Sequence, residues 1–257
     1  KSLLKMESHH KLSLVVPCYN CGDYIYRNLH EVIRTLKKFD INHEIIVVDD
    51  GSTDNTFKEA KEAENGNLKV VGYTNNKGKG FALKYGFKHA TGDFITFADA
   101  DLDIHPRQLM TLMKYMDGSN ADIVIGSKRH PLSKIDYPFR RRLYSFLYHT
   151  FVNVLFNTKV KDTQSGLKLM KYDCAKAVLP KIIVKRYAFD LELIVVANKL
   201  RFKVVEAPIV IKQLFNDSHV GVEAVKNMFI DTLGIAYRLY IMRWYDKGHR
   251  ISRVVEK

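Results

Sequence analysis

Three acidic side chains stand at alternate positions just after a short apolar segment. Asp99, Asp101 and Asp103 follow the strand predicted at 93–98. If the backbone stays extended there, the three carboxylates point the same way, and like charges at such close range repel unless a cation lies among them. A hard ion such as Mg²⁺ or Mn²⁺, with phosphate oxygens of a substrate as its other ligands, meets that need. The alternative is a solvated turn whose aspartates precede the helix after Pro106.

A second acidic pair and a basic loop have a similar setting. Asp49 and Asp50 end another apolar segment, where one carboxylate can hydrogen-bond a base or a ribose while the other caps the next helix. Residues 76–80, Asn-Lys-Gly-Lys-Gly, form a flexible basic loop that opens a helix, which is a favourable place for an anion. The loop lacks the G-x-x-x-x-G-K-[ST] pattern of a Walker phosphate-binding loop.

The segments around these clusters alternate between strand and helix. Apolar runs predict strands at 12–16, 44–48, 68–73, 93–98 and 122–125, and helical spacing predicts helices at 24–38, 52–64, 80–90 and 109–116. Such alternation indicates a mainly parallel sheet covered by helices on both faces. Ligands bind beyond the carboxyl ends of the strands in these sheets. Three clusters follow such an end directly: Pro-Cys-Tyr-Asn at 17–20, Asp-Asp-Gly-Ser at 49–52 and Asp-Ala-Asp at 99–101.

The second half of the chain is less regular. Its pattern predicts a helix at 139–156 headed by three arginines, a polar loop at 162–166, a helix at 189–200, a strand at 203–208 and a terminal amphipathic helix at about 222–244. The apolar stripe of the terminal helix comprises Val225, Phe229, Leu233, Ala236, Tyr240 and Trp244, accompanied by Lys226, Arg238, Arg243 and Lys247. We expect this stripe to dock on its own domain, and partial contact with a membrane surface is compatible with that arrangement.

Composition narrows the classes of function. The chain has 257 residues, of which 46% are hydrophobic, enough for one large domain or a domain with an appendage. The formal net charge of +13 favours an anionic partner: nucleic acid, acidic lipid or a phosphorylated substrate. Three cysteines do not make a disulfide framework, and the C-x-x-C pair Cys18 and Cys21 has no second pair of ligands with zinc-site spacing. No stretch is apolar enough to predict a membrane span, and the chain begins at Lys1, so we expect it to be a fragment or an engineered form.

In combination, these motifs are specific. The series VVPCYN at 15–20, VVDDGSTD at 47–54, NKGKG at 76–80 and GD at 92–93 followed by DAD at 99–101 resembles the family 2 glycosyltransferases over about residues 12–210. The resemblance implies an α/β fold of the GT-A type, a Rossmann-like, mainly parallel sheet flanked by helices, with a C-terminal amphipathic helix. Within the family, GSKR at 126–129, the arginines at 140–142 and DTQSGLK at 162–168 are most similar to dolichyl-phosphate mannose and glucose synthases. DTQSG together with RYAFDLE at 186–192 resembles the glucose enzymes more closely.

The resemblance also implies a division of the chain. Residues 1–11 form a disordered or engineered N-terminus, and 12–215 form the catalytic domain, with a nucleotide-sugar half at 12–127 and an acceptor half at 128–215. Residues 216–257 form a helical segment that associates with membranes.

Roles carry over residue by residue on the same basis. The nucleotide-sugar site would comprise Pro17, Tyr19, Asn20, Asp49, Asp50, Lys79, Asp99 and Ala100. The metal would be held by Asp101 and Asp103, and the acceptor phosphate by Lys128, Arg129, Arg141, Arg142, Ser165 and Lys168. The catalytic residues would be Asp99, Asp101, Arg141 and Arg142. Two departures from the family pattern stand out: Lys128 replaces an arginine, which weakens a bidentate phosphate grip, and Asp103 replaces a glutamine of the mannose enzymes.

The implied reaction is metal-dependent, inverting transfer of a hexose from UDP-glucose, or second GDP-mannose, to a polyprenyl or dolichyl phosphate. We expect Mg²⁺ or Mn²⁺ as cofactor, a membrane surface but no nucleic acid as partner, and a location at the cytoplasmic face of a membrane, peripheral or anchored by segments outside this chain. Two alternatives stay open. A glycan or other soluble acceptor would need a general base, for which Asp190 or Glu192 could serve. The second alternative is a basic nucleotide- or nucleic-acid-binding module without catalysis. The lack of an RNA-binding signature in the sequence argues against it.

Overall fold

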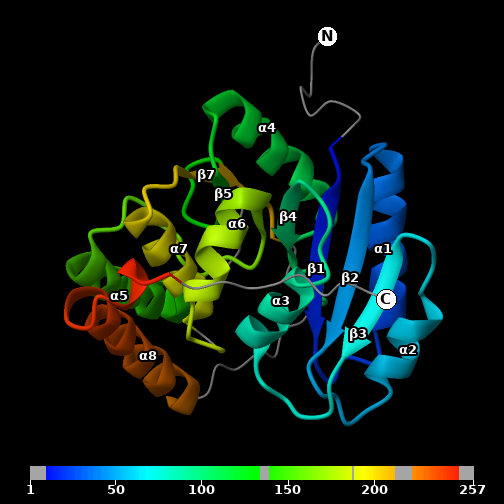
Figure 1. Cartoon of the computed structure of the whole chain (residues 1–257), viewed down its shortest axis with the longest axis horizontal. Helices are drawn as coiled ribbons and strands as arrows, with labels where there is room; N and C mark the ends of the chain where they lie inside the picture. The colour runs from blue at the N-terminus through cyan, green and yellow to red at the C-terminus, as the bar shows by residue number, and fades with distance from the viewer. Residues whose placement is uncertain (1–9, 134–138, 187, 212–221, 249–257) are drawn as a thin grey trace.

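A computed structural model of the chain describes residues 10–133, 139–186, 188–211 and 222–248 (Figure 1). Within these ranges, the side chains of residues 139–146, 222 and 224 are outside the description.

One sheet of seven strands runs through the molecule. The strands are β1 (Leu12–Cys18), β2 (His43–Asp49), β3 (Leu68–Gly72), β4 (Phe94–Phe97), β5 (Ile123–Ser127), β6 (Lys168–Lys171) and β7 (Val204–Pro208). Their order across the sheet is β3-β2-β1-β4-β6-β5-β7. All neighbours are parallel except β6, which runs antiparallel to β4 and to β5. The carboxyl ends of β1, β2 and β4 therefore lie along one edge, as the sequence predicts.

Helices cover both faces of this sheet. They are α1 (Ile25–Lys38), α2 (Thr56–Glu62), α3 (Lys79–Phe87), α4 (Leu109–Ser119), α5 (Phe139–Phe156), α6 (Tyr172–Val178), α7 (Phe189–Lys199) and α8 (Val222–Tyr240), with short 3₁₀ turns η1 (Pro106–Gln108), η2 (Leu179–Lys181) and η3 (Trp244–Asp246). Because side chains alternate along a strand, each strand feeds two cores. Val15 and Ile46 pack with α3, α6 and α7, whereas Leu14 and Ile45 pack with α1, α2 and α4.

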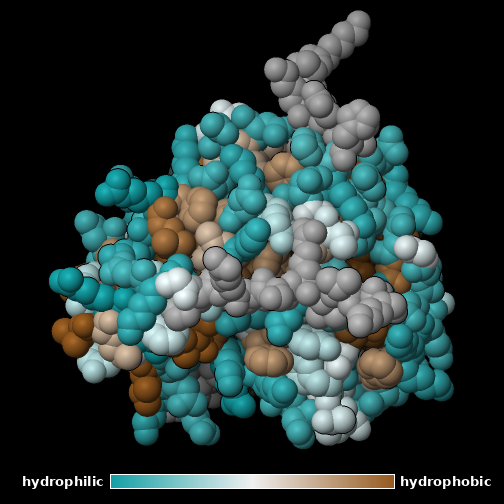
Figure 2. Space-filling model, in the orientation of Figure 1, coloured by the Kyte–Doolittle hydropathy of each residue, from teal (hydrophilic) through white to brown (hydrophobic). Residues whose placement is uncertain are grey.

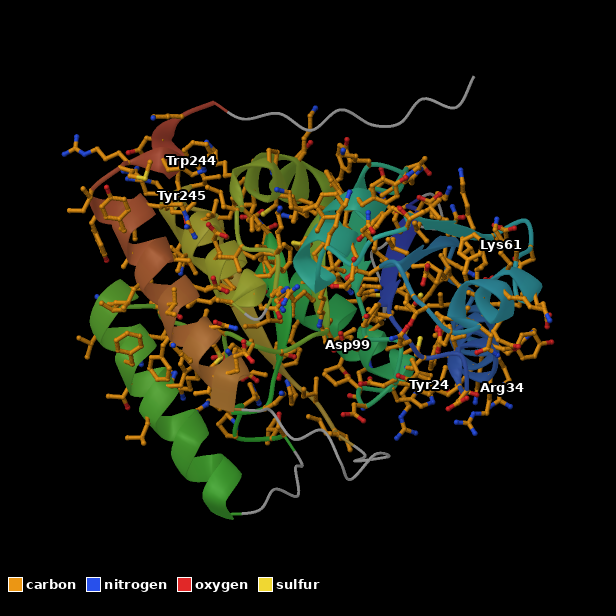
Figure 3. The ribbon with its side chains drawn as sticks, turned by 90° about the horizontal axis from the view of Figure 1, so that it is seen from below. Tyr24, Arg34, Lys61, Asp99, Trp244 and Tyr245 are labelled. Atoms are coloured by element: carbon orange, nitrogen blue, oxygen red, sulfur yellow. The ribbon has the colours of Figure 1, made fainter. Side chains whose placement is uncertain are left out.

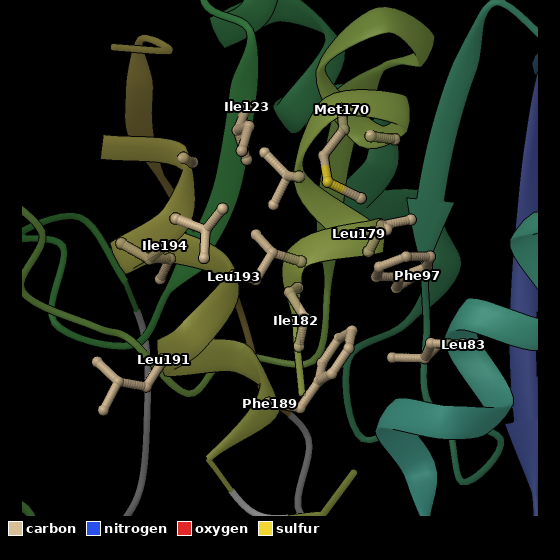
Figure 4. Packing of buried hydrophobic residues seen from close by; sticks show 14 of the residues in the cluster. Leu83, Phe97, Ile123, Met170, Leu179, Ile182, Phe189, Leu191, Leu193 and Ile194 are labelled. Atoms are coloured by element: carbon tan, nitrogen blue, oxygen red, sulfur yellow. The ribbon is translucent and has the colours of Figure 1, made fainter. Parts of the chain in front are cut away.

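The first of these cores joins the two halves of the chain. Figure 4 shows Phe97 of β4, Leu83 of α3 and Phe189 of α7 converging with Ile123 and Met170 of the neighbouring strands. The strands of the first half of the chain and the helices of the second half therefore share one packed interior. This packing fixes the positions of α3 and α7 relative to the edge of the sheet.

The C-terminal helix α8 packs on α5 and α7. Its buried side chains include Thr232 and Ile235, with Phe229 and Leu239 packed against the same core. The docking face is therefore rotated from the predicted stripe, since Leu233 and Tyr240 are exposed. Figure 2 shows apolar side chains at the edge of the molecule formed by α5 and α8. Among the described residues, no helix has the length and apolarity needed to cross a bilayer.

The predicted α/β architecture is confirmed, with two omitted elements and with several element ends displaced by a few residues. The sequence reading missed β6 and α6, because four residues beginning and ending with lysine do not resemble a buried strand. The terminal helix ends at Tyr240 and not at Trp244, since Arg243 adopts a left-handed backbone (φ 48°) that a helix does not continue through.

Candidate active site

A cavity of about 900 Å³ opens at the carboxyl ends of β1, β2 and β4. We name it the donor cavity after the sugar-nucleotide donor that the family resemblance predicts for several of its lining residues. Figure 3, seen from below, shows Asp99 and Tyr24 in this part of the molecule. The cavity is lined by Pro17, Cys18, Tyr19, Cys21, Tyr24, Asp50, Asn76, Gly78, Lys79, Asp99, Ala100, Asp101, Arg186 and Asp190. Topology thus brings together three of the clusters that the sequence places after strands. Of the predicted donor residues, only Asn20 and Asp49 do not line the cavity.

Asp50 organises the loop that opens α3. Its carboxylate accepts hydrogen bonds from Tyr73 Oη (2.7 Å), Asn76 Nδ2 (3.1 Å) and the main-chain N–H groups of Lys77 (2.8 Å) and Gly78 (2.9 Å). The anion that this basic loop binds within the chain is therefore Asp50 itself. Burial and the neighbouring Asp50 carboxylate raise the pKa of Tyr73, so Tyr73 stays a hydrogen-bond donor.

The side chains of Asp49 and Asn20 form hydrogen bonds within the loops that follow β1 and β2. Asp49 accepts hydrogen bonds from the main-chain N–H (3.3 Å) and the hydroxyl of Ser52. Asn20 Oδ1 accepts from the N–H of Thr53 (2.9 Å), and the Asn20 N–H donates to Ser52 Oγ (3.0 Å). Direct donor contact by these two side chains is not supported by their placement, because Asn20 joins the loops that follow β1 and β2 and Asp49 bonds within the second of them.

Asp99 forms an ion pair with Lys79 inside the donor cavity. Burial by itself would raise the pKa of Asp99, but the positive charges of Lys79, Lys168 and Lys128 outweigh burial and lower this pKa. The Asp99 carboxylate is therefore ionised. The loop before β6 closes tightly over this carboxylate: a Cβ on Gly166 would lie 1.9 Å from Asp99 Oδ2. A side chain at position 166 would displace Asp99, which explains why glycine is needed there.

Asp101 shares the cavity with Asp99 but has a different charge balance. Burial, together with the charges of Asp99 and Asp103, raises the pKa of Asp101 to about 6. The expected extended backbone through these aspartates is wrong, since Leu102 adopts a left-handed conformation (φ 58°). Asp103 is not among the residues that line the cavity, and its N–H donates to Asp101 Oδ1 (3.1 Å). Of the three carboxylates, Asp99 and Asp101 therefore line the cavity, next to a backbone conformation that is uncommon for leucine.

The predicted acceptor residues divide into three groups. Lys168 is fully buried, where its ammonium bonds to Asp190 Oδ1 (2.7 Å) and to the carbonyl of Ser165. In this structure its ammonium is held in a buried ion pair, so its placement does not support an open phosphate ligand, and the sequence-based role stays a prediction. Ser165 is also buried, and its Oγ is without a hydrogen-bond partner among the described residues.

Lys128 and Arg129 are half-buried in the turn that follows β5, where the Lys128 N–H donates to Asp162 Oδ2 (2.7 Å). Lys128 is close enough to the donor cavity to influence the pKa of Asp99. Arg141 and Arg142 are in the first turn of α5, and their side chains lie outside the described part of the structure. The phosphate-binding roles of these four residues remain predictions.

The two candidate general bases have opposite surroundings. Glu192 is fully buried, and its carboxylate accepts from the N–H groups of Ile183 (2.9 Å) and Val184 (2.7 Å), from Tyr245 Oη (2.5 Å) and from Arg238 Nε (3.2 Å). The prediction that Glu192 could be a base is wrong, because no substrate proton can reach it. Asp190 does line the donor cavity, but it is paired with Lys168.

Comparison with known proteins identifies the family. Residues 13–179 match the family model described as Glycosyl transferase family 2. The chain belongs to this family. The activity that the sequence indicates, glycosyl transfer, is therefore confirmed. Most residues that line the cavity of this glycosyltransferase lie within the matched region, whereas Arg186 and Asp190 follow it.

Curated relatives extend the likeness to nearly the whole chain. The glycosyltransferase is 27% identical over 252 residues to a dolichyl-phosphate beta-glucosyltransferase of Dictyostelium discoideum, covering 92% of this chain and 77% of the relative. It is 32% identical over 251 residues to a dolichyl-phosphate beta-glucosyltransferase of Trichomonas vaginalis, covering 92% and 76%.

A solved structure confirms the fold. Glucosyl-3-phosphoglycerate synthase from Mycobacterium tuberculosis, crystallised with Mn²⁺, UDP-glucose and phosphoglyceric acid, superposes with a TM-score of 0.68 at 18% identity, covering 94% of this chain and 81% of that one. The predicted GT-A fold of this glycosyltransferase is thereby confirmed.

The residues of the glycosyltransferase suit a hard divalent ion in part. Asp99 and Asp101 offer carboxylate oxygens to the same cavity, and the raised pKa of Asp101 reflects a local excess of negative charge that a cation relieves. The described residues contain no group of three His, Cys, Asp or Glu side chains arranged to hold a metal. The remaining ligands would therefore have to come from substrate oxygens or water.

Several cavity residues were missed or underused by the sequence reading. Tyr24 was read only as the start of a helix, and Arg186 only as part of a motif. Cys18 and Cys21 were weighed as redox or zinc ligands, whereas both are free, buried thiols in the cavity wall. The available signal was position: Cys18 and Cys21 flank Tyr19 directly after β1, where ligand contacts are expected.

Proposed function

We propose that this glycosyltransferase transfers a glucosyl group, with inversion, from UDP-glucose to a polyprenyl or dolichyl phosphate in the presence of Mg²⁺ or Mn²⁺, with GDP-mannose as the second donor to test. The observation that carries the proposal is the likeness over 92% of the chain to dolichyl-phosphate beta-glucosyltransferases. The donor cavity supports it independently, because it combines carboxylates for a metal with an exposed aromatic ring, Tyr19, able to stack on a base.

The surroundings of the acidic residues favour an acceptor that is already an anion. Glu192 is sealed by four donors, and Asp190 is neutralised by Lys168. A lipid phosphate is ionised at neutral pH and needs no strong base to attack the anomeric carbon. Catalysis then rests on positioning and on charge stabilisation.

Two residues prepare the donor side of this reaction. Lys79 forms an ion pair with Asp99, and Gly166 leaves the space that the Asp99 carboxylate occupies. Asp101, oriented by the N–H of Asp103, would hold the ion together with Asp99. When bound, the divalent ion supplies positive charge against that of the departing nucleoside diphosphate.

The exposed face of α8 supports a location at a membrane surface, and we place the enzyme at the cytoplasmic face. Ile230, Leu233, Tyr237 and Ile241 are exposed at helical spacing or just past the helix end. The basic residues Lys226, Arg243 and Lys247 are exposed on the same helix and the turn after it. Apolar side chains insert at the headgroup level while each nearby basic residue adds about 1 kcal/mol of attraction to an acidic leaflet.

The test is transfer of radiolabelled sugar from UDP-glucose and from GDP-mannose to a short polyprenyl phosphate, with Mg²⁺, with Mn²⁺ and with EDTA. We expect label from UDP-glucose in the lipid phase, lost with EDTA. A larger signal from GDP-mannose would correct the donor. Donor hydrolysis without lipid label would move the acceptor to a soluble glycan, and full activity in EDTA would remove the metal.

A further inference from the structure

The donor cavity has an uneven supply of positive charge. Among its lining residues, the cations are Lys79 and Arg186. Lys79 is already paired with Asp99, and the charge of Asp99 helps to raise the pKa of Lys79 against the effect of burial. A nucleoside diphosphate brings at least two negative charges into a cavity that already holds Asp50, Asp99 and Asp101. A further cation besides a metal ion would offset this negative charge and bond to the phosphate oxygens.

Arg186 is available for that purpose. It is exposed, and its guanidinium forms no ion pair or hydrogen bond with the residues that the structure describes, although its charge favours the ionised form of Asp231 in the neighbouring cavity. It lines the donor cavity and also a neighbouring cavity of about 540 Å³, which Lys77, Lys185 and Ile230 help to form. Arg186 therefore stands where the two cavities meet, and a guanidinium there can offer its planar fork to phosphate oxygens.

The backbone that carries Arg186 is held at several points. Lys84 Nζ donates to the carbonyl of Ile182 (2.6 Å), and the Gly80 N–H donates to the carbonyl of Lys185 (2.8 Å). Gly78, with φ 93°, packs so closely that a Cβ would lie 2.8 Å from Arg186 Cγ. The loop that opens α3 and the segment 182–186 thus fix each other, and the first of them is bound to Asp50.

Buried Glu192 anchors the same segment from inside. One carboxylate oxygen accepts from the N–H groups of Ile183 and Val184, and the other contacts Arg238 of α8 and Tyr245 of η3. Figure 3 shows Tyr245 at the end of α8, far along the chain from Asp99. Burying a carboxylate costs free energy unless it is paired and hydrogen-bonded, as it is here. The network positions the segment, and of its exposed side chains Arg186 is the one that lines the donor cavity.

We propose that Arg186 binds the diphosphate of the sugar nucleotide and holds the nucleoside diphosphate as it departs. This role rests on the proposed function for its donor class, and it goes beyond it by naming a residue outside the acidic clusters. Arg186 then complements the metal: carboxylates hold the ion on one side of the diphosphate, and the guanidinium contacts the oxygens at the junction of the cavities.

The test measures the Kd of UDP, GDP, uridine and guanosine by calorimetry in the presence of Mg²⁺. Ligands that bind too weakly for direct titration are measured by their competition with a tighter one. The variant Arg186→Met keeps the aliphatic stem that packs on Gly78, and Lys185→Met is the matched control on the adjacent residue. We expect Arg186→Met to raise the Kd for the nucleoside diphosphates about ten-fold or more, as loss of a charged hydrogen bond does. The Kd for the nucleosides should be unchanged. Lys185→Met, outside the donor cavity, should change the diphosphate Kd by less than about two-fold because its charge is screened.

Three results would overturn the role of Arg186: an unchanged diphosphate Kd, an equal loss for nucleoside and diphosphate, or an equal loss in Lys185→Met. A wild-type protein that binds neither UDP nor GDP would overturn the donor class and this role together. If diphosphate binding depends on Arg186 while no lipid acceptor is glycosylated, the acceptor of the proposed function fails and Arg186 keeps its role.

Discussion

Two ion pairs of the same chemistry lie side by side at the sheet edge and have different surroundings. Lys79 and Asp99 have side chains 37% and 35% exposed, and both line the donor cavity. Lys168 and Asp190 have side chains 0% and 12% exposed. The first pair comes from the parallel part of the sheet, where loops after strands meet at an open edge. The second joins the antiparallel strand β6 to α7, where the ammonium of Lys168 is enclosed and Asp190 keeps only a small exposed area at the cavity wall. The same residue types therefore serve a ligand site in one region and the architecture in the other.

Lys168→Met tests whether the buried ion pair is structural, and it has the largest expected effect. Because the substitution leaves Asp190 buried without its cation, we expect the free energy of unfolding to fall by about 3–5 kcal/mol, measured by urea denaturation. Lys171→Met on the same strand is the control: its ion pair with Asp122 is partly exposed (38% and 28%) and should contribute about 0–1 kcal/mol. If Lys168→Met instead keeps full stability and raises only the KM for the acceptor, the sequence-based phosphate role is correct.

Asp101→Asn tests the open side of the comparison. The variant removes a cavity carboxylate while preserving shape, so we expect kcat to fall about 10²–10³-fold, equivalent to roughly 3–4 kcal/mol, with an unchanged melting temperature. Asp117→Asn, an exposed acid on α4, should leave kcat unaltered. Wild-type kcat in Asp101→Asn would show that this carboxylate has no part in metal or donor binding.

How much of the molecule could be predicted differs between the same two regions. Asp50, Asp99 and Asp101 were placed correctly in one cavity, because parallel strands bring the residues after them to a common edge whatever lies between. The burial of Lys168 was missed because it depends on β6 inserting between β4 and β5, a long-range pairing with no local signal. Glu192 was misread for a similar reason: its partners Arg238 and Tyr245 lie about fifty residues away in the chain.

Conformation at single residues was also beyond the sequence. Nothing in Asp-Ala-Asp-Leu-Asp announces a left-handed Leu102, and the alternation of acids argued for an extended segment. Packing around the turn imposes a conformation that leucine rarely adopts alone, and so Asp103 supports Asp101 through its main chain.

Tyr245→Phe tests the buried hydrogen-bond network around Glu192. It removes the hydroxyl that donates to Glu192 (2.5 Å), a hydrogen bond to a buried carboxylate that is worth about 1.5–3 kcal/mol. We expect that loss in the free energy of unfolding, with a smaller rise in the Kd for UDP as the segment carrying Arg186 loosens. The control is Tyr240→Phe, whose hydroxyl donates to the Leu155 carbonyl at an exposed position. Equal stabilities of the two variants would mean that the Glu192 network does not hold the C-terminal region.

The smallest expected effect separates a ligand from a support at the open edge. Asn20 combines a left-handed backbone (φ 47°) with side-chain hydrogen bonds to Thr53. Asn20→Gly keeps the backbone freedom and deletes the side chain, so it should cost about 0.5–1.5 kcal/mol of stability for the lost hydrogen bonding. Asn20→Ala should cost about 1 kcal/mol more, because alanine resists this conformation. The Kd for UDP should then change only slightly in Asn20→Gly, since Asn20 does not line the donor cavity. A ten-fold weaker Kd at unchanged stability would instead make Asn20 the donor ligand that the family resemblance implies, and would extend the open region beyond the cavity described here.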